Sequence, residues 1–167
     1  PKIISDNAGG AIIVWEDSIN GTWDIYAQRL SSAGTQLWTS GGITVCGAVS
    51  SQINARLETD GANGTIIVWQ DKRNGADYDI YAQRVNASGV VQWAANGIFI
   101  ASNVGTQSNA KIEPDNAGGA IIAWQDKRNG VDYDIYAQRV NATGSTQWIT
   151  NGVAVCSKVI TPSIQNF

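Results

Sequence analysis

The stretch Asp24-Ile25-Tyr26-Ala27-Gln28-Arg29-Leu30 decides the fold, because it returns almost unchanged at residues 79–85 and again at residues 134–140. Successive copies begin 55 residues apart. A fixed period of about this length is typical of repeat architectures, in which each unit is one supersecondary element. We therefore divide the chain into three units, at residues 1–54, 55–109 and 110–167, the last of which includes the start of a further strand.

Each unit is expected to fold as four short strands separated by Gly- and Asn-rich turns. The second strand is an unbroken, mostly β-branched apolar run that ends in Trp, which predicts a strand covered on both faces. The third strand is the repeated stretch, and the fourth passes through another Trp. The predicted ranges are Lys2–Ser5, Arg56–Thr59 and Lys111–Pro114 for the first strand, Ala11–Trp15, Thr65–Trp69 and Ala120–Trp124 for the second, and segments through Trp38, Trp93 and Trp148 for the fourth.

The composition suits a turn-rich, all-β protein and excludes several partners. Charged residues make up 15% of the 167 residues, and the formal net charge is −3. This balance provides no basic surface for nucleic acid or for an anionic membrane. No apolar run approaches the roughly 20 residues of a membrane-spanning helix. The chain contains no Met and begins at Pro1, so we expect it to be a processed or excised piece of a longer protein.

Four antiparallel strands per unit, repeated in tandem, predict an all-β fold of β-propeller blades. Three blades cannot close a ring, since propellers typically have about 4 to 8. We therefore expect half of a six-bladed ring formed by two chains, or part of a longer array. An open array exposes two apolar blade faces, which favours self-association. The alternative is a β-trefoil, lectin-like domain, which also has three four-stranded units but closes within one chain.

The segment Asp71-Lys72-Arg73-Asn74-Gly75-Ala76-Asp77-Tyr78-Asp79-Ile80-Tyr81, followed by the turn Asn86–Gly89, resembles the TolB-type, WD40-like β-propeller repeat. The pattern recurs at Asp126–Tyr136 and, in weaker form, at Asp17–Tyr26. The whole unit is also similar to repeats of secreted or surface-displayed bacterial proteins. The resemblance implies a propeller fold and an extracellular or cell-surface location. The unit differs from the TolB-type repeat in being longer, with an additional Trp-bearing strand.

The sequence offers little for catalysis. The chain has no His, and no Ser lies in a nucleophile-elbow motif. We therefore expect no enzymatic activity and no cofactor. The candidate ligand-binding residues are aromatic and basic residues of the loop before the repeated stretch, which suit sugars or peptides: Trp23, Arg73, Tyr78, Arg128 and Tyr133.

A calcium site in the same loops is the weaker alternative, because carboxylate oxygens are the ligands that calcium prefers. The candidate ligands are Asp71, Asp77, Asp79, Asp126, Asp132 and Asp134. Lys and Arg side chains within these loops oppose a cation, so we expect the carboxylates to bind turn amides and the loop Arg instead.

Other recurring residues have structural interpretations. We expect Trp15, Trp69 and Trp124 to lie in the core. We expect Cys46 and Cys156 to be free, buried thiols, since equivalent positions on non-adjacent blades are too far apart for a disulfide. The three Arg residues of the repeated stretch are each expected to pair with an Asp of a neighbouring blade; they are Arg29, Arg84 and Arg139.

These features favour a non-enzymatic, extracellular β-propeller repeat module with a structural, assembly or adhesion role. The expected partners are further copies of the chain or flanking blades of a longer chain, with glycans or surface proteins as alternatives. A carbohydrate- or peptide-binding propeller module is the second hypothesis.

Overall fold

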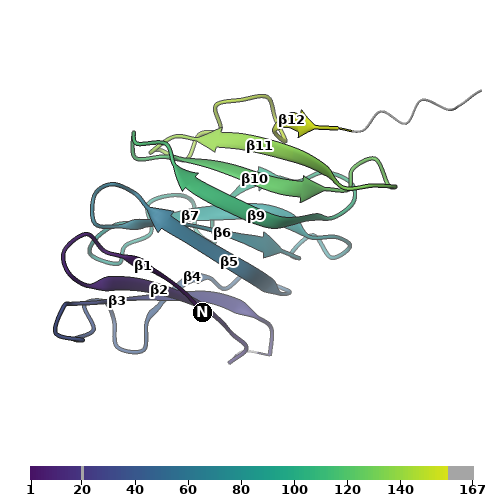
Figure 1. The fold of residues 1–167 in the computed structure, drawn as a ribbon. Helices are drawn as coiled ribbons and strands as arrows, with labels where there is room; N and C mark the ends of the chain where they lie inside the picture. Colours follow the sequence, from purple (N-terminus) through teal and green to yellow (C-terminus); the bar gives the residue numbers. More distant parts are fainter. Residues whose placement is uncertain (20, 158–167) are drawn as a thin grey trace, which may run out of the picture.

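The computed structural model describes residues 1–19 and 21–157, which form β-strands and no helix. The strands make three antiparallel four-stranded sheets, each built from four consecutive strands. Figure 1 shows the sheets stacked face to face in chain order, from the purple N-terminal sheet to the yellow-green C-terminal sheet. The predicted all-β fold of three four-stranded blades is thus confirmed, and the sheets do not close into a ring. We call the sheets blades 1, 2 and 3.

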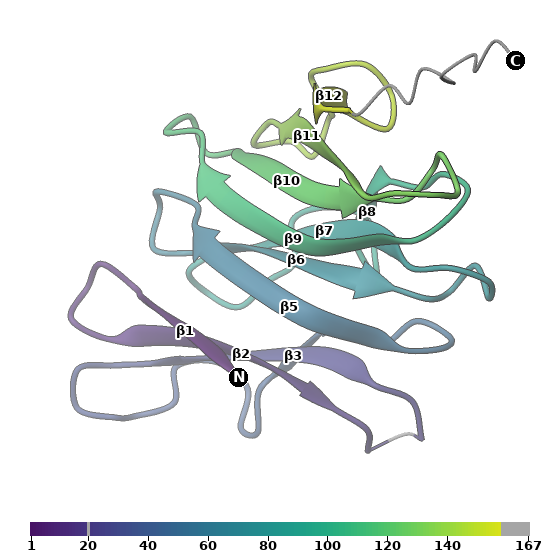
Figure 2. The same ribbon diagram turned by 45° about the vertical axis from the view of Figure 1, so that its right-hand side comes forward.

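The blades have the same strand order. Blade 1 contains β1 (Lys2–Ser5), β2 (Ala11–Asp17), β3 (Asp24–Leu30) and β4 (Ile43–Cys46). Blade 2 contains β5 (Gln52–Thr59), β6 (Thr65–Asp71), β7 (Asp79–Val85) and β8 (Ile98–Ala101). Blade 3 contains β9 (Gln107–Pro114), β10 (Ala120–Asp126), β11 (Asp134–Val140) and β12 (Val153–Cys156). The first strands β1, β5 and β9 lie on the same side of the stack in both views (Figures 1 and 2).

Two boundaries differ from the prediction. The first strands of blades 2 and 3 begin at Gln52 and Gln107, so the unit boundaries at 55 and 110 fall inside strands. Asn54 (φ 58°) and Asn109 (φ 53°) adopt left-handed backbone within these strands, where a bulge shifts the register. The expected start of a fourth blade, at residues 158–167, lies outside the described residues.

The prediction for the fourth strand is wrong in one respect: Trp38, Trp93 and Trp148 lie in the loop that precedes it. In blade 1 the side chain of Gln28 takes the place of a strand partner. It accepts a hydrogen bond from the Trp38 N–H (3.0 Å) and donates one to the Thr39 carbonyl (2.8 Å). Because a side chain satisfies these backbone groups, the segment needs no β-ladder.

The β-trefoil alternative is also wrong. Each four-stranded unit forms its own sheet, and no hydrogen-bonded strand pairing joins one sheet to another among the described residues. A trefoil requires its units to share one closed barrel. Here the units meet through their faces and through hydrogen bonds at the strand ends and loops, such as that from the Gln52 N–H to the Trp23 carbonyl (2.6 Å).

The core consists of two apolar clusters, one at each junction between blades. Every residue of β6 in the middle blade is buried, which confirms the predicted coverage on both faces. The same coverage is not reached by β2 and β10, which alternate between buried and more accessible residues. Among the described residues, the blade of each has a neighbouring blade on one side only. Accordingly, Trp69 and Trp124 are buried as expected, while Trp15 is half-buried.

No helix in the part of the chain that the structure describes is long and apolar enough to cross a membrane.

The repeat allows a matched test of this core. Ile67 is completely buried in the middle blade, whereas its equivalent Ile13 lies on the open face of blade 1 and is half-buried. We expect Ile67→Ala to lower the free energy of unfolding by about 3 kcal/mol, through lost burial and the cavity left behind. Ile13→Ala should cost about 1 kcal/mol. Urea denaturation at low protein concentration measures both, and equal losses would contradict the proposed difference in coverage.

Candidate functional site

Each blade presents two apolar faces to its surroundings. We call the face toward the next blade along the chain the leading face, and the face toward the preceding blade the trailing face. In the middle blade, Ile66 on the leading face packs against blade 3, and Ile67 on the trailing face packs against blade 1. The two junctions therefore join the same pair of surfaces, used twice in succession.

A Trp on the leading face anchors each junction. The indole Nε1 of Trp38 donates a hydrogen bond to the Ala87 carbonyl of blade 2 (3.0 Å), and Trp93 donates in the same way to the Ala142 carbonyl of blade 3 (3.1 Å). Both side chains are almost completely buried, at 7% and 8% exposed. Each Trp thus combines a large apolar contact with a satisfied polar atom, as buried indoles require.

A glycine on the trailing face makes room for each Trp. A Cβ atom at Gly89 would lie 2.7 Å from the Trp38 ring, and one at Gly144 would lie 2.9 Å from the Trp93 ring. These glycines belong to the turns that also contain the acceptor carbonyls. The turn is therefore the docking site for the Trp of the preceding blade.

The Arg of the repeated stretch supports the same carbonyls. Arg29 and Arg84 donate from Nη1 to the Ala87 and Ala142 carbonyls, at 3.0 and 3.2 Å. The predicted pairing with an Asp of a neighbouring blade is wrong, because each Arg forms its ion pair within its own blade at 2.9 Å. Within a blade the Asp at the first turn faces the end of the third strand, which brings the two charges together. The pairs are Asp6–Arg29, Asp60–Arg84 and Asp115–Arg139.

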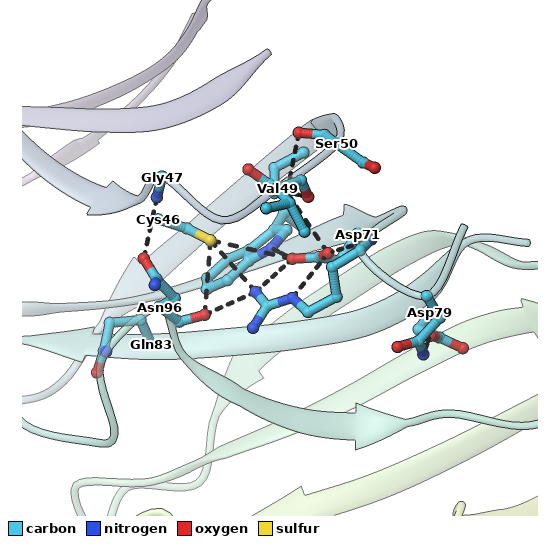
Figure 3. A network of polar contacts seen from close by, with 12 residues as sticks. Cys46, Gly47, Val49, Ser50, Asp71, Asp79, Gln83 and Asn96 are labelled. Carbon is cyan, nitrogen blue, oxygen red and sulfur yellow. Dashed lines mark hydrogen bonds and ion pairs between the residues drawn. The ribbon is translucent and has the colours of Figure 1, made fainter. Parts of the chain in front are cut away.

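A second polar network crosses the junction of blades 1 and 2, and Figure 3 shows it from close by. The buried carboxylate of Asp71 accepts hydrogen bonds from Trp69 Nε1 (2.8 Å) and from Arg73 Nη2 (2.5 Å). The same guanidinium donates to the Asn96 carbonyl (2.8 Å) and to the Cys46 sulfur of blade 1 (3.3 Å). The Asp–Arg pair thereby links the two blades.

The network recurs at the next junction around Asp126 and Arg128, which form an ion pair at 2.5 Å. Arg128 donates to the Asn151 carbonyl (2.8 Å), and Asn151 Oδ1 accepts from the Ser102 N–H of blade 2 (3.0 Å). Blade 1 lacks the Arg, because Ile19 occupies the equivalent position and is 75% exposed. The network therefore occurs in blades 2 and 3, whose trailing faces pack against the preceding blade of the same chain.

The two outer faces of the stack carry the residues of a junction without its other half. On the leading face of blade 3, Trp148 is 37% exposed, and the Arg139 side chain is 40% exposed, against 11% and 19% for the equivalent Arg29 and Arg84. On the trailing face of blade 1, a Cβ atom at Gly34 would have no heavy atom within 4 Å. These open faces are the candidate functional site.

Hydrogen bonding and charge lower the pKa of three Asp residues. Burial raises the pKa of Asp126, but hydrogen bonds from Arg128 and Trp124 outweigh burial and hold that pKa below its ordinary value. The pKa of Asp115 is lowered in the same way, with burial opposed by the turn N–H groups and by Arg139. Hydrogen bonding from the Ala8 N–H likewise lowers the pKa of Asp6. These carboxylates are therefore held in the ionised form.

The predicted ligand-binding residues differ in their accessibility to solvent. Trp23 and Tyr133 are exposed, at 48% and 51%, while Tyr78 is half-buried. The guanidinium groups of Arg73 and Arg128 turn inward to their Asp partners instead of facing solvent beside the aromatic rings. Ligand binding by the loops stays a prediction, and its aromatic members are the accessible ones.

The calcium alternative gains no support from the side-chain positions. Arg73 and Arg128 neutralise Asp71 and Asp126. Three other candidates accept hydrogen bonds: Asp77 from Thr106, Asp79 from Asn74, and Asp134 from Asn129. Residues 1–19 and 21–157 contain no group of three acidic, His or Cys side chains placed to hold a metal ion, so Asp132 also lies outside any such group.

Both cysteines are free, as expected. Cys46 is buried at the first junction, and burial raises the pKa of its thiol to about 12. The prediction of a buried thiol is wrong for Cys156, which is exposed. The reason is the position of Cys156 on the open leading face of blade 3. The equivalent Cys46 lies on the leading face of blade 1, which blade 2 covers.

The docking role of the glycine-containing turn was missed in the sequence. Its signal is that the Trp and the Gly repeat with the same period of 55 residues, from Trp38 to Trp93 and from Gly89 to Gly144. The shared period does not show that the Trp ring contacts the turn of the next unit. A Trp within a strand, as predicted, gives no reason to expect that contact.

Comparison of the chain with protein-family models, curated proteins and solved structures found no match.

The lowered pKa values of Asp6, Asp115 and Asp126 predict acid sensitivity. Their stabilising contribution is complete above the ordinary carboxylate pKa of 3.8 and is lost as the pH falls through the lower pKa of the folded state. We expect Asp126→Asn to lower the free energy of unfolding at neutral pH by about 2 kcal/mol, because it leaves Arg128 without its charged partner. The variant should also lose less stability than the parent below about pH 4.

Urea denaturation at a series of pH values measures both effects. Asp132→Asn is the matched control, since Asp132 is an exposed loop residue whose substitution should change stability by less than about 0.5 kcal/mol. Parallel pH profiles for the parent and Asp126→Asn would contradict the assigned role.

Proposed function

We propose that this chain is a non-enzymatic, extracellular β-propeller repeat module whose role is structural assembly, and that it associates with further blades of the same kind through its two open blade faces. The observation that carries the proposal is the difference in burial between equivalent residues. Trp38 and Trp93 are 7% and 8% exposed at the formed junctions, whereas Trp148 is 37% exposed on the open face.

The open face of blade 3 is apolar beyond the Trp itself. Val155 is 64% exposed, while the equivalent Val45 and Ile100 are 2% and 0% exposed at the two junctions. Exposed apolar side chains of this kind favour association, because removing their surface from water is favourable. The third unit therefore displays the same docking residues as the first two, without the blade that covers them.

A propeller supports this role because its blades pack on one another through both faces. The extracellular or cell-surface setting rests on the resemblance of the repeat to those of secreted and surface-displayed bacterial proteins. A non-catalytic role is supported by the repetition of the Asp71–Arg73 pair as Asp126–Arg128 at equivalent positions. The same pair at both junctions is expected of an element that joins blades rather than of a single reaction centre.

Measurement of mass in solution tests the assembly role. We expect the mass to rise above the 17.8 kDa of one chain as concentration increases, within the range from about 1 µM to 1 mM in which weak specific interfaces form. Sedimentation equilibrium gives the mass. A 17.8 kDa particle at every concentration would rule out assembly.

The two thiols provide a second readout on the same samples. Cys156 lies on the open face and should react with a maleimide when the chain is dilute and become protected as it associates, while buried Cys46 should stay unreactive throughout. Constant reactivity of Cys156 during a rise in mass would show that association uses another surface.

Binding of sugars or peptides is the second candidate function, and the exposed rings of Trp23 and Tyr133 favour it. Aromatic rings of this kind stack on apolar faces of ligands. We expect a glycan array to show binding that decreases at least about tenfold in the double variant Trp23→Ala, Tyr133→Ala, a loss of about 1.4 kcal/mol. Tyr81→Phe is a control for nonspecific change. Absence of binding by the parent would leave assembly as the proposal.

A further inference from the structure

We infer that two copies of this chain associate head to tail, with the leading face of blade 3 in one copy docked on the trailing face of blade 1 in the other, and with Trp148 donating its indole N–H to the Ser32 carbonyl over Gly34. The inference rests on the proposed assembly role and specifies its polarity and its contact atoms. A second copy is the occupant because the open faces carry the docking elements that already join the blades within the chain.

The repeat assigns the atoms of this contact. The turn Asn86–Gly89 that receives Trp38 is equivalent to residues 31–34 of blade 1, so Ser32 takes the place of Ala87, and Gly34 that of Gly89. The space above Gly34 is free of neighbouring heavy atoms, whereas Gly89 and Gly144 are covered by Trp rings. Blade 1 thus has the receiving turn of a junction, with no Trp in it.

The donor side is already in position. Gln138 accepts a hydrogen bond from the Trp148 N–H (2.9 Å) and donates to the Ile149 carbonyl (2.9 Å), which is the arrangement that Gln83 provides for Trp93. The backbone that carries Trp148 is therefore fixed as at a formed junction, although its ring is partly exposed. Docking then requires little ordering of the loop, which limits the entropic cost of association.

The apolar surroundings of the contact also match. On the donor side, Val155 is equivalent to the buried Val45 and Ile100. On the receiving side, Ile3 is 66% exposed, while its equivalents Leu57 and Ile112 are 5% and 6% exposed. A contact between these two different faces is heterologous, in contrast to the pairing of identical faces in an isologous dimer.

Two substitutions make this contact weaker than the junctions within the chain. Ile19 replaces the Arg that joins blades 1 and 2, and Gly41 replaces Asn96, whose side-chain oxygen binds the Gly47 N–H at 3.1 Å. The docked faces therefore lack the Arg–Asn network. The contact depends instead on apolar burial and on the Trp148 indole, so we expect an association that reverses on dilution.

Two charge substitutions separate head-to-tail from face-to-face pairing. Val155→Lys disables the leading face of blade 3, and Ile3→Lys disables the trailing face of blade 1. Both residues are exposed in the single chain, so the fold tolerates the changes. At a docked face either Lys is buried without a partner, which should weaken the contact by about 100-fold or more. Val131→Lys is the matched control, since Val131 is 66% exposed on a loop.

Sedimentation equilibrium on each variant and on an equal mixture gives the result. We expect each variant alone to be monomeric, and the mixture to form a one-to-one pair through its intact leading and trailing faces. Val131→Lys should associate as the parent does. Self-association of Val155→Lys or of Ile3→Lys at the strength of the parent, or a monomeric mixture, would overturn the head-to-tail contact. If the parent itself stays monomeric, the proposed assembly role fails as well.

Trp148→Phe tests the assigned hydrogen bond. This change keeps an aromatic ring but removes the indole donor, and we expect it to weaken association of the parent about 2- to 10-fold. Val131→Ala, at an exposed loop residue of blade 3, should leave association unchanged. Unaltered association of Trp148→Phe would overturn the contact with the Ser32 carbonyl.

Discussion

The structure depends on the burial of both faces of the central strand in each blade. The second strand of every unit is apolar, and only β6 of the middle blade has all of its residues buried. A four-stranded sheet cannot cover its own two faces, so each blade needs a neighbour on either side. Within residues 1–19 and 21–157, the stack satisfies this need at two junctions and leaves one leading face and one trailing face open.

Polar atoms at the junctions give this apolar packing its register. The Trp38 indole reaches the Ala87 carbonyl only when its ring lies over Gly89, so one hydrogen bond and one glycine fix how the blades dock. The Asp71–Arg73 pair adds a second link near the Cys46 thiol (Figure 3). Because these contacts recur at the next junction, the faces behave as a defined pair of surfaces. The proposed association of two copies extends this pairing beyond the chain.

The repeat predicted which residues of the candidate site are equivalent, but it did not predict all of their contacts. The period placed Trp38, Trp93 and Trp148 at equivalent positions, but their assignment to a strand was wrong because Gln28, Gln83 and Gln138 hold the Trp segments as loops. The Arg residues of the repeated stretch were expected to pair across blades, and they pair within them. Both errors have one cause, which is that the period shows which polar side chains recur in each unit but not which groups those side chains contact.

The sequence by itself determined the four-stranded unit, its threefold repetition and the need for contacts beyond one unit, because apolar runs and turn residues encode strands and their spacing. Only the tertiary structure decided which residues are open. Cys46 and Cys156 occupy equivalent positions, yet one is buried and the other exposed. Both cysteines end the fourth strand of their unit. The difference comes from whether a neighbouring blade is present, which is a property of the stack and not of the unit.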